Sequence, residues 1–224
     1  WQASTNGTNW SNLVGANGPN LTSTISVPAY FRCALTCNSV TSYSTPAFVG
    51  INPVSQCYCT SSASSNADDD IGNVTFGSLN NGVVGNATNN VTSINTYTDF
   101  TNLSPQLFYP GSSYPISVTQ INRLGFYACS LAVYIDYNQN GDFDVNSENV
   151  FIALSNAAVG GNVMNGSVTI PLNTISGITR MRLVLIEGNN NPMSPCGTYT
   201  WGETEDYLIN IQQALPCVTP PTAG

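Results

Sequence analysis

Ser130-Leu131-Ala132-Val133-Tyr134-Ile135-Asp136-Tyr137 is the stretch that decides the fold. Its apolar residues Leu131, Val133 and Ile135 fall on every second position, the side-chain period of a β-strand. Residues 179–187 repeat the pattern. Their alternating apolar positions are Met181, Leu183 and Leu185. Both stretches predict strands that place one face against a hydrophobic core, as in a β-sandwich.

The rest of the chain is punctuated in the same way. Short runs rich in Val, Ile, Tyr and Thr are separated by clusters of Asn, Gly, Ser and Pro, and no useful stretch has a helical period. The further strands that this spacing predicts are 30–36, 47–52, 73–79, 114–120, 149–154, 166–171 and 206–212. The sequence therefore predicts an all-β protein.

Composition narrows the possible functions. Only 7% of the 224 residues are charged, the net charge is −8, and histidine is absent. The negative charge argues against nucleic acid as a partner, because phosphate binding needs clustered Lys and Arg. The lack of histidine removes the commonest general base, so we expect no enzymatic activity. No apolar run approaches 18 residues, so we expect no membrane span.

The cysteines indicate a secreted protein. The seven cysteines have no zinc-type spacing and indicate disulfides, which form in oxidising compartments. Eight Asn-x-Ser/Thr sequons make a glycoprotein an open alternative, although a chain so rich in Asn, Ser and Thr contains several by chance. They lie at Asn6, Asn9, Asn20, Asn73, Asn86, Asn90, Asn102 and Asn165.

The cysteines differ in which disulfide partners they can reach. Cys33 and Cys37 lie four apart on one expected strand, roughly 13 Å between Cα atoms, which is too far for a mutual disulfide. Each therefore needs another partner, and the candidates are Cys57, Cys59 and Cys217. Cys129 and Cys196 border sandwich strands. We expect them to pair within the larger domain, leaving no free thiol there.

Three segments follow from these patterns. A segment of residues 1–53 precedes a β-sandwich of residues 54–213. The connector 214–224 contains Pro216-Cys217-Val218-Thr219-Pro220-Pro221, and its prolines exclude it from a central strand.

The first segment resembles the later half of Ig-like repeats in large bacterial surface proteins. The matching stretches are Trp1-Gln2-Ala3-Ser4, Asn6-Gly7-Thr8-Asn9-Trp10 and Tyr30-Phe31-Arg32-Cys33-Ala34-Leu35-Thr36-Cys37. The resemblance implies a partial Ig-like β-sandwich in which Trp1 packs on a disulfide made by Cys33. The strands expected before Trp1 are missing, and the connector resembles the opening of a further repeat. The alternative is a small β-segment with a core tryptophan.

The larger segment resembles the GEVED domain, a module of secreted bacterial proteins. Matching stretches run in order over residues 58–211, among them Tyr58-Cys59, 133–144, Thr179-Arg180-Met181-Arg182, Pro195-Cys196-Gly197 and Gly202-Glu203-Thr204-Glu205-Asp206-Tyr207. The signature carries Thr204 where the family name has Val. The resemblance implies a jelly-roll-like sandwich that accompanies proteases and adhesins, and it implies no activity.

One loop has the ligand spacing of a calcium site. Counted from Asp136, oxygen-bearing side chains fall at loop positions 1, 3, 5 and 9, a glycine falls at position 6, and position 7 can offer its carbonyl. This is the first part of an EF-hand-type loop, although the closing acid comes one place late and a strand precedes the loop. The alternative is a plain Asn-Gly turn. We expect calcium to bind Asp136, Asn138, Asn140, Asp142, Asp144 and Glu148.

Two further acidic clusters occur, at 68–70 and at Glu203, Glu205 and Asp206. We expect Asp68, Asp69 and Asp70 to form a solvated loop tip. Arg180 and Arg182 are natural partners for Glu203 or Asp206. A second cation is an alternative, and paired catalytic carboxylates are the least favoured reading because nothing indicates a cleft.

Together these features predict an extracellular, cell-surface structural or adhesive module, a subunit or repeat of a fibre or large adhesin stabilised by calcium and disulfides. Its expected partners are other copies of itself, joined head to tail through residues 214–224 and the N-terminal segment; tandem repetition in one polypeptide is the alternative. The alternative function is a carbohydrate-binding accessory module of a secreted hydrolase, with glycans as ligands.

Overall fold

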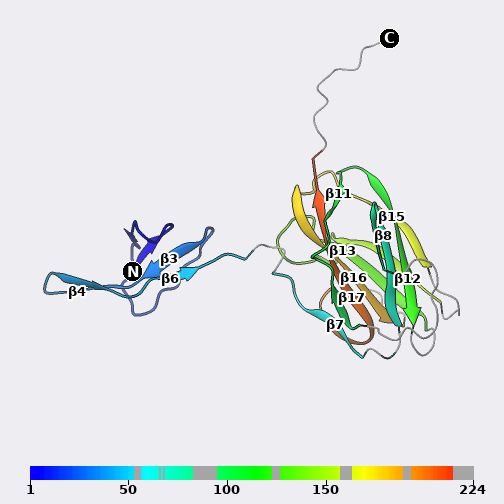
Figure 1. Ribbon diagram of the computed structural model, residues 1–224, viewed down its shortest axis with the longest axis horizontal. Coiled ribbons are helices and arrows are strands. Elements are labelled where there is room, and N and C mark those ends of the chain that lie inside the picture. Colours follow the sequence, from blue (N-terminus) through cyan, green and yellow to red (C-terminus); the bar gives the residue numbers. More distant parts are fainter. Residues whose placement is uncertain are drawn as a thin grey trace, which may run out of the picture. The chain divides into compact units, whose positions relative to one another are not determined.

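The computed structural model describes residues 1–52, 57–65, 67, 69–82, 95–122, 127–156, 163–188 and 193–213. The described residues form strands and connections and no helix, which confirms the all-β prediction. None of them builds a helix long and apolar enough to cross a membrane. The chain divides into two compact units, Trp1–Pro53 and Val54–Gly224 (Figure 1). They are called the N-terminal unit and the larger unit below.

The N-terminal unit is one thin sheet and one hairpin. The sheet has the order β2-β1-β3-β6, and β4 pairs with β5 in the hairpin. The strands are β1 Gln2–Ser4, β2 Ser11–Asn12, β3 Ala29–Arg32, β4 Ala34–Cys37, β5 Val40–Tyr43 and β6 Ala47–Val49. On one face the Arg32 guanidinium lies 4.1 Å from the Trp10 ring and 3.9 Å from the Tyr43 ring.

The strand predicted at 30–36 is interrupted, which corrects the expectation for Cys33 and Cys37. The N–H of Cys33 donates to Ser44 Oγ at 2.9 Å, and the Ser44 N–H donates to the Cys33 carbonyl at 3.0 Å. These bonds draw the chain out of β3 and into the hairpin. The hairpin turns through Asn38 and Ser39, both at positive φ, as the type I′ form of a two-residue hairpin loop requires.

The larger unit is a two-sheet sandwich. One sheet has the path β10-β17-β16-β13-β14, with β7 and β11 also paired to β17, and the other has the order β15-β12-β8-β9. The strands are β7 Ser61–Ser65, β8 Asp69–Phe76, β9 Leu79–Gly82, β10 Tyr97–Asp99, β11 Gln106–Phe108, β12 Ser113–Asn122, β13 Cys129–Ile135, β14 Asn149–Leu154, β15 Val163–Thr169, β16 Gly177–Glu187 and β17 Gly197–Ile211. Figure 1 shows the two layers facing each other.

The core lies between these layers. Leu131, Val133 and Ile135 of β13 point into it and are fully buried, together with the alternating apolar residues of β16, as their spacing predicted. The other face of the larger sheet carries a smaller cluster. Its members are Ala132, Tyr134, Phe143, Val184 and Met193. This second cluster anchors the connections described next.

Candidate functional site

The loop after β13 folds around Asp136, which is fully buried. Its Oδ2 accepts hydrogen bonds from the Tyr58 hydroxyl at 2.6 Å and from the Gly141 N–H at 3.0 Å. Its Oδ1 accepts from the Asn140 N–H at 3.2 Å. Gly141 has a φ of 85°, a conformation that glycine adopts without strain. Asp136 therefore closes the turn and ties it to the segment before β7.

The buried carboxylate of Glu148 holds the loop together by accepting hydrogen bonds from its backbone. Its Oε1 accepts from the N–H groups of Tyr137 at 3.0 Å and Asn138 at 3.2 Å, and its Oε2 from the Asp144 N–H at 2.9 Å. Burial raises the pKa of this carboxyl, and the nearby charge of Asp136 raises it further. Two carboxylates thus share the inner side of the loop.

The other four predicted ligands are exposed. Their side-chain oxygens accept N–H groups one or two residues ahead, and one such bond, from Asn146, lowers the pKa of Asp144. These four residues are Asn138, Asn140, Asp142 and Asp144. Among the described residues, no three of the loop's carboxylates lie within 4.8 Å of one another. Calcium would keep Asp136 and Glu148 in place and require the exposed side chains to turn inward.

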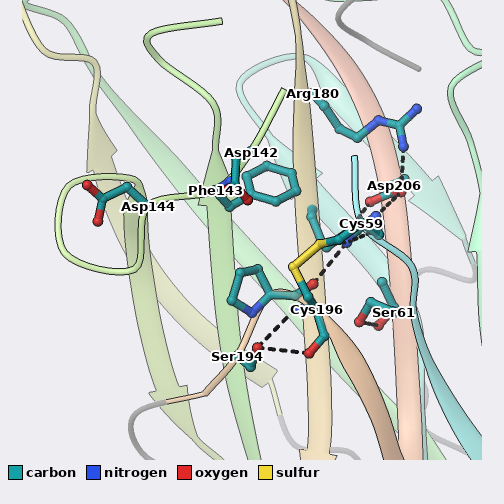
Figure 2. The surroundings of a disulfide bond; sticks show 12 residues. Cys59, Ser61, Asp142, Phe143, Asp144, Arg180, Ser194, Cys196 and Asp206 are labelled. Carbon is teal, nitrogen blue, oxygen red and sulfur yellow. Dashed lines mark hydrogen bonds and ion pairs between the residues drawn. A yellow bond between two sulfur atoms is a disulfide. The ribbon is translucent and has the colours of Figure 1, made fainter. Parts of the chain in front are cut away.

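A disulfide lies beside this loop. Cys59 is bonded to Cys196, with 5.7 Å between their Cα atoms, and a carboxylate oxygen of Asp142 lies within 4.8 Å of both sulfur atoms (Figure 2). Cys196 therefore pairs within the larger unit, as predicted, but its partner is Cys59 and not Cys129. The sequence signal for the observed pair is the resemblance's own Tyr58-Cys59 and Pro195-Cys196 stretches.

A buried ion pair holds both halves of this disulfide. Arg182, 1% exposed, donates to Asp206 through Nε and Nη2, each at 2.7 Å. Its Nη1 donates to the carbonyls of Cys59 at 2.8 Å and Pro195 at 2.9 Å. Arg180 adds a third contact to Asp206 at 3.0 Å. Of the two predicted acidic partners, the structure thus selects Asp206.

Glu203 and Glu205 face the opposite way, into the sandwich. Glu203 meets Asp70 of β8, and its Oε2 accepts the Ile71 N–H at 3.1 Å. Burial raises the pKa of Glu203 to about 11, helped by Asp70 and by the charge of Glu205. Burial likewise raises the pKa of Glu205 to about 8, although the Tyr207 hydroxyl donates to it at 2.8 Å.

The predicted solvated tip at 68–70 is wrong for two of its residues. Asp69 and Asp70 are 1% and 3% exposed and begin β8, and burial raises both of their pKa values. The backbone pairs with β12, and buried polar partners replace water around the carboxyls. Asp68 lies outside the described residues, as do Asn86, Asn90 and the connector 214–224 with Cys217.

The remaining cysteines correct a second expectation. Cys129 is 1% exposed and forms no disulfide, so the larger unit does contain a free thiol. Burial raises the pKa of this thiol, and the Asp69 carboxylate raises it further. Cys33 and Cys37 of the N-terminal unit form no disulfide with any described residue.

A hollow of ≈ 540 Å³ opens beside the ion pair. Hydroxyl and aromatic side chains line it together with Arg180 and Arg182. Tyr97 donates to Asp206 at 3.1 Å, and Arg180 lies 4.7 Å from the Tyr58 ring. This hollow is one of the concave surfaces of the described residues that a small polar ligand could meet.

Comparison with known proteins identifies part of the chain. Residues 130–210, which run from β13 into β17, match the GEVED domain family, confirming that resemblance for this stretch. No curated protein matches the chain significantly.

Solved structures offer only slight likenesses. The crystal structure of a CARDB domain from Pyrococcus furiosus, in complex with di-metal ions, is 16% identical over 48% of this chain and 84% of its own, with a TM-score of 0.28. AvmM, described as catalysing macrocyclization in alchivemycin A biosynthesis, is 11% identical over 70% of this chain and 94% of its own, with a TM-score of 0.30. TM-scores this low establish no common fold.

Proposed function

We propose that the chain is an extracellular structural or adhesive β-module, a subunit or repeat of a cell-surface fibre or large adhesin. The observation that carries this is the N-terminal unit's lack of a core. Among its described residues, Ala29 is the only apolar residue that is buried, while Phe48 is 59% exposed and Val49 is 42% exposed. A sheet in this state needs a covering partner. The proposal assigns no enzymatic activity to the chain.

The uncovered surface is one face of the sheet. Cross-strand pairing puts Ala3 opposite Phe31, Phe31 opposite Ala47, and Ala29 opposite Val49, so these apolar residues share a face. Ala29 is the only one of them that is buried, and Phe48, which pairs with Tyr30, lies on the opposite face. A hollow of ≈ 360 Å³ on this unit is lined by Trp1, Phe31 and Val49, together with loop residues such as Leu21 and Ile25. Strand β6 pairs only with β3 among the described residues, which leaves an edge for an added strand.

The occupant we propose is the connector 214–224 of another copy, which has Leu215 and Val218 to cover the apolar face and Cys217 for a disulfide to Cys33 or Cys37. Head-to-tail repetition of one such contact builds an open fibre. A preceding segment of the same polypeptide would cover the sheet equally well, and the native mass distinguishes the two.

The expected result is a concentration-dependent assembly in native mass measurements. Val49→Asp is expected to reduce the assembled fraction at least about tenfold, because it buries a charge in the contact. Leu172→Asp, at a residue of the larger unit that is 80% exposed, is the matched control and should leave assembly intact. A chain that stays monomeric at every concentration contradicts assembly between copies.

Calcium stabilisation is the second part of the proposal. The observation that supports it is the pair of buried carboxyls, Asp136 and Glu148, that share the inner side of the loop and accept no hydrogen bond from an arginine of the described residues. We expect saturating calcium, at about 100 times its Kd, to add about 2.7 kcal/mol of stability and raise the Tm by several degrees. Glu148→Gln should abolish the shift and Asp99→Asn should not. Melting curves that coincide in calcium and in chelator contradict it.

Carbohydrate binding is the second candidate function, and the observation that favours it is the hollow beside Arg180, with Tyr97 and several hydroxyl side chains in its lining. A glycan array separates the candidates. A purely structural module binds no glycan, whereas a binding module loses its signal on Tyr97→Ala.

A further inference from the structure

Gln120 and Cys129 meet across the two layers of the sandwich. Gln120 belongs to β12 of one sheet and Cys129 begins β13 of the other, and they are 0% and 1% exposed. The Gln120 Nε2 lies 3.3 Å from the Cys129 Sγ. A thiol in contact with a side-chain carboxamide is a nucleophile beside an acyl group.

Asp69 of β8 touches both members of this pair. Its Oδ1 accepts a hydrogen bond from Gln120 Nε2, and its carboxylate is close enough to the Cys129 thiol to raise the pKa of that thiol, which itself donates to the Tyr127 carbonyl at 3.7 Å. Its Oδ2 is buried and has no hydrogen-bond partner among the described residues. One carboxylate is thus placed to take the thiol proton and to deliver it to the amide nitrogen.

We propose that Cys129 and Gln120 form an internal thioester that joins the two sheets covalently. The sulfur attacks the side-chain carbonyl carbon of Gln120 while Asp69 accepts the thiol proton. Asp69 then protonates the amide nitrogen, the C–N bond breaks, and ammonia leaves. One S–C bond replaces one C–N bond, and no oxidant or reductant takes part.

The surroundings suit each stage of this reaction. Burial raises the pKa of the thiol, so a free thiolate is disfavoured and the proton must move as the bond forms. Burial also raises the pKa of Asp69, which makes it a stronger base than an exposed carboxylate. The Tyr127 carbonyl accepts a second hydrogen bond from Gln120 Nε2 at 2.9 Å and holds the amide in place. The same burial shields the product from water.

The mass of the intact protein tests the proposal directly. The thioester lowers the mass by one ammonia, about 17 Da, relative to the sequence with its disulfides. Unfolding in methylamine should open it. The amine then appears on Gln120 and a thiol that can be alkylated appears on Cys129, both located by peptide mapping.

Variants assign the roles. Cys129→Ala and Asp69→Asn should each abolish the ammonia loss and the methylamine label, whereas Cys37→Ala, at an exposed cysteine, should change neither. The wild-type measurement decides even if a variant fails to fold. A wild-type mass without ammonia loss, or a loss that maps to an Asn-Gly succinimide and not to Gln120, overturns the proposal.

Discussion

Asp206→Ala is expected to reduce the free energy of unfolding by about 3–5 kcal/mol, because it leaves Arg182 charged and buried without its partner. Arg182 and Asp206 are 1% and 0% exposed, and Arg180 loses its contact with Asp206 in the same variant. The carbonyls of Cys59 and Pro195 do not neutralise a guanidinium. Urea unfolding of the wild type and the variant measures the difference.

The double variant Arg182→Met with Asp206→Leu separates charge burial from packing. It removes both charges together and should recover at least half of the loss, because the penalty of an unpaired buried charge disappears. Asp99→Ala, at an exposed carboxylate, should cost less than about 1 kcal/mol. A loss below about 1 kcal/mol in Asp206→Ala would show that the ion pair does not stabilise the sandwich.

Stability is expected to fall as pH rises, by at least about 2 kcal/mol between pH 5 and pH 8, because one unit of pKa difference is worth about 1.4 kcal/mol. Folding raises the pKa of Glu203 from 4.5 to about 11 and that of Glu205 from 4.5 to about 8. A carboxyl with a raised pKa holds its proton in the folded state after the unfolded chain has released it. Its stabilising contribution is complete below pH 4.5 and is lost progressively above it.

Glu203→Gln tests which group carries this dependence. The amide keeps the shape, donates to Asp70, and cannot ionise, so the slope of stability against pH should shrink by about half and stability at pH 8 should rise. Asp69, Asp70 and Glu148 also have raised pKa values and account for part of the remaining slope. Asp99→Asn is the matched control. Equal stability of the wild type at pH 5 and pH 8 would contradict the raised values.

The sequence predicted the sandwich strands best where large aliphatic side chains take every second position, although both faces of β13 are buried. In β13 and β16 every second residue enters the core, so the sequence itself shows apolar residues at every second position. Strand β8 was predicted to start at residue 73 and starts at Asp69, because acidic residues are typical of loops and only tertiary contacts make them strand residues. The short strands β7, β10 and β11 were missed. They pair in parallel with β17, over distances in sequence that no local pattern records.

The part of the candidate site that could be predicted from the sequence is the pairing of its opposite charges. Two arginines beside an acidic signature predicted an ion pair with Glu203 or Asp206, and the structure has it with Asp206. The calcium site predicted for the loop after β13 stays a prediction. Which acid would face the core depended on the register of β17, where Glu203 and Glu205 take one face and Asp206 the other. The only sequence signal for the Cys59–Cys196 pair was that both cysteines lie in stretches that resemble the GEVED domain. The approach of Gln120 to Cys129 depends on the packing of distant strands, which the sequence does not reveal.

A pulling force applied to the two ends of the chain enters the larger unit before β7 and leaves through β17, and Cys59–Cys196 joins the segment before β7 to the residue that precedes β17. The load then runs through the sulfur atoms and bypasses the sandwich strands between the two cysteines. The two cysteines are 137 positions apart in the sequence. Each residue between them would lengthen the chain by up to about 3.4 Å if it unfolded, and the disulfide prevents this extension. Only the residues outside the segment that the disulfide closes can extend under tension. A series of such modules would behave as a stiff tether, and reduction of the Cys59–Cys196 disulfide would make it extensible.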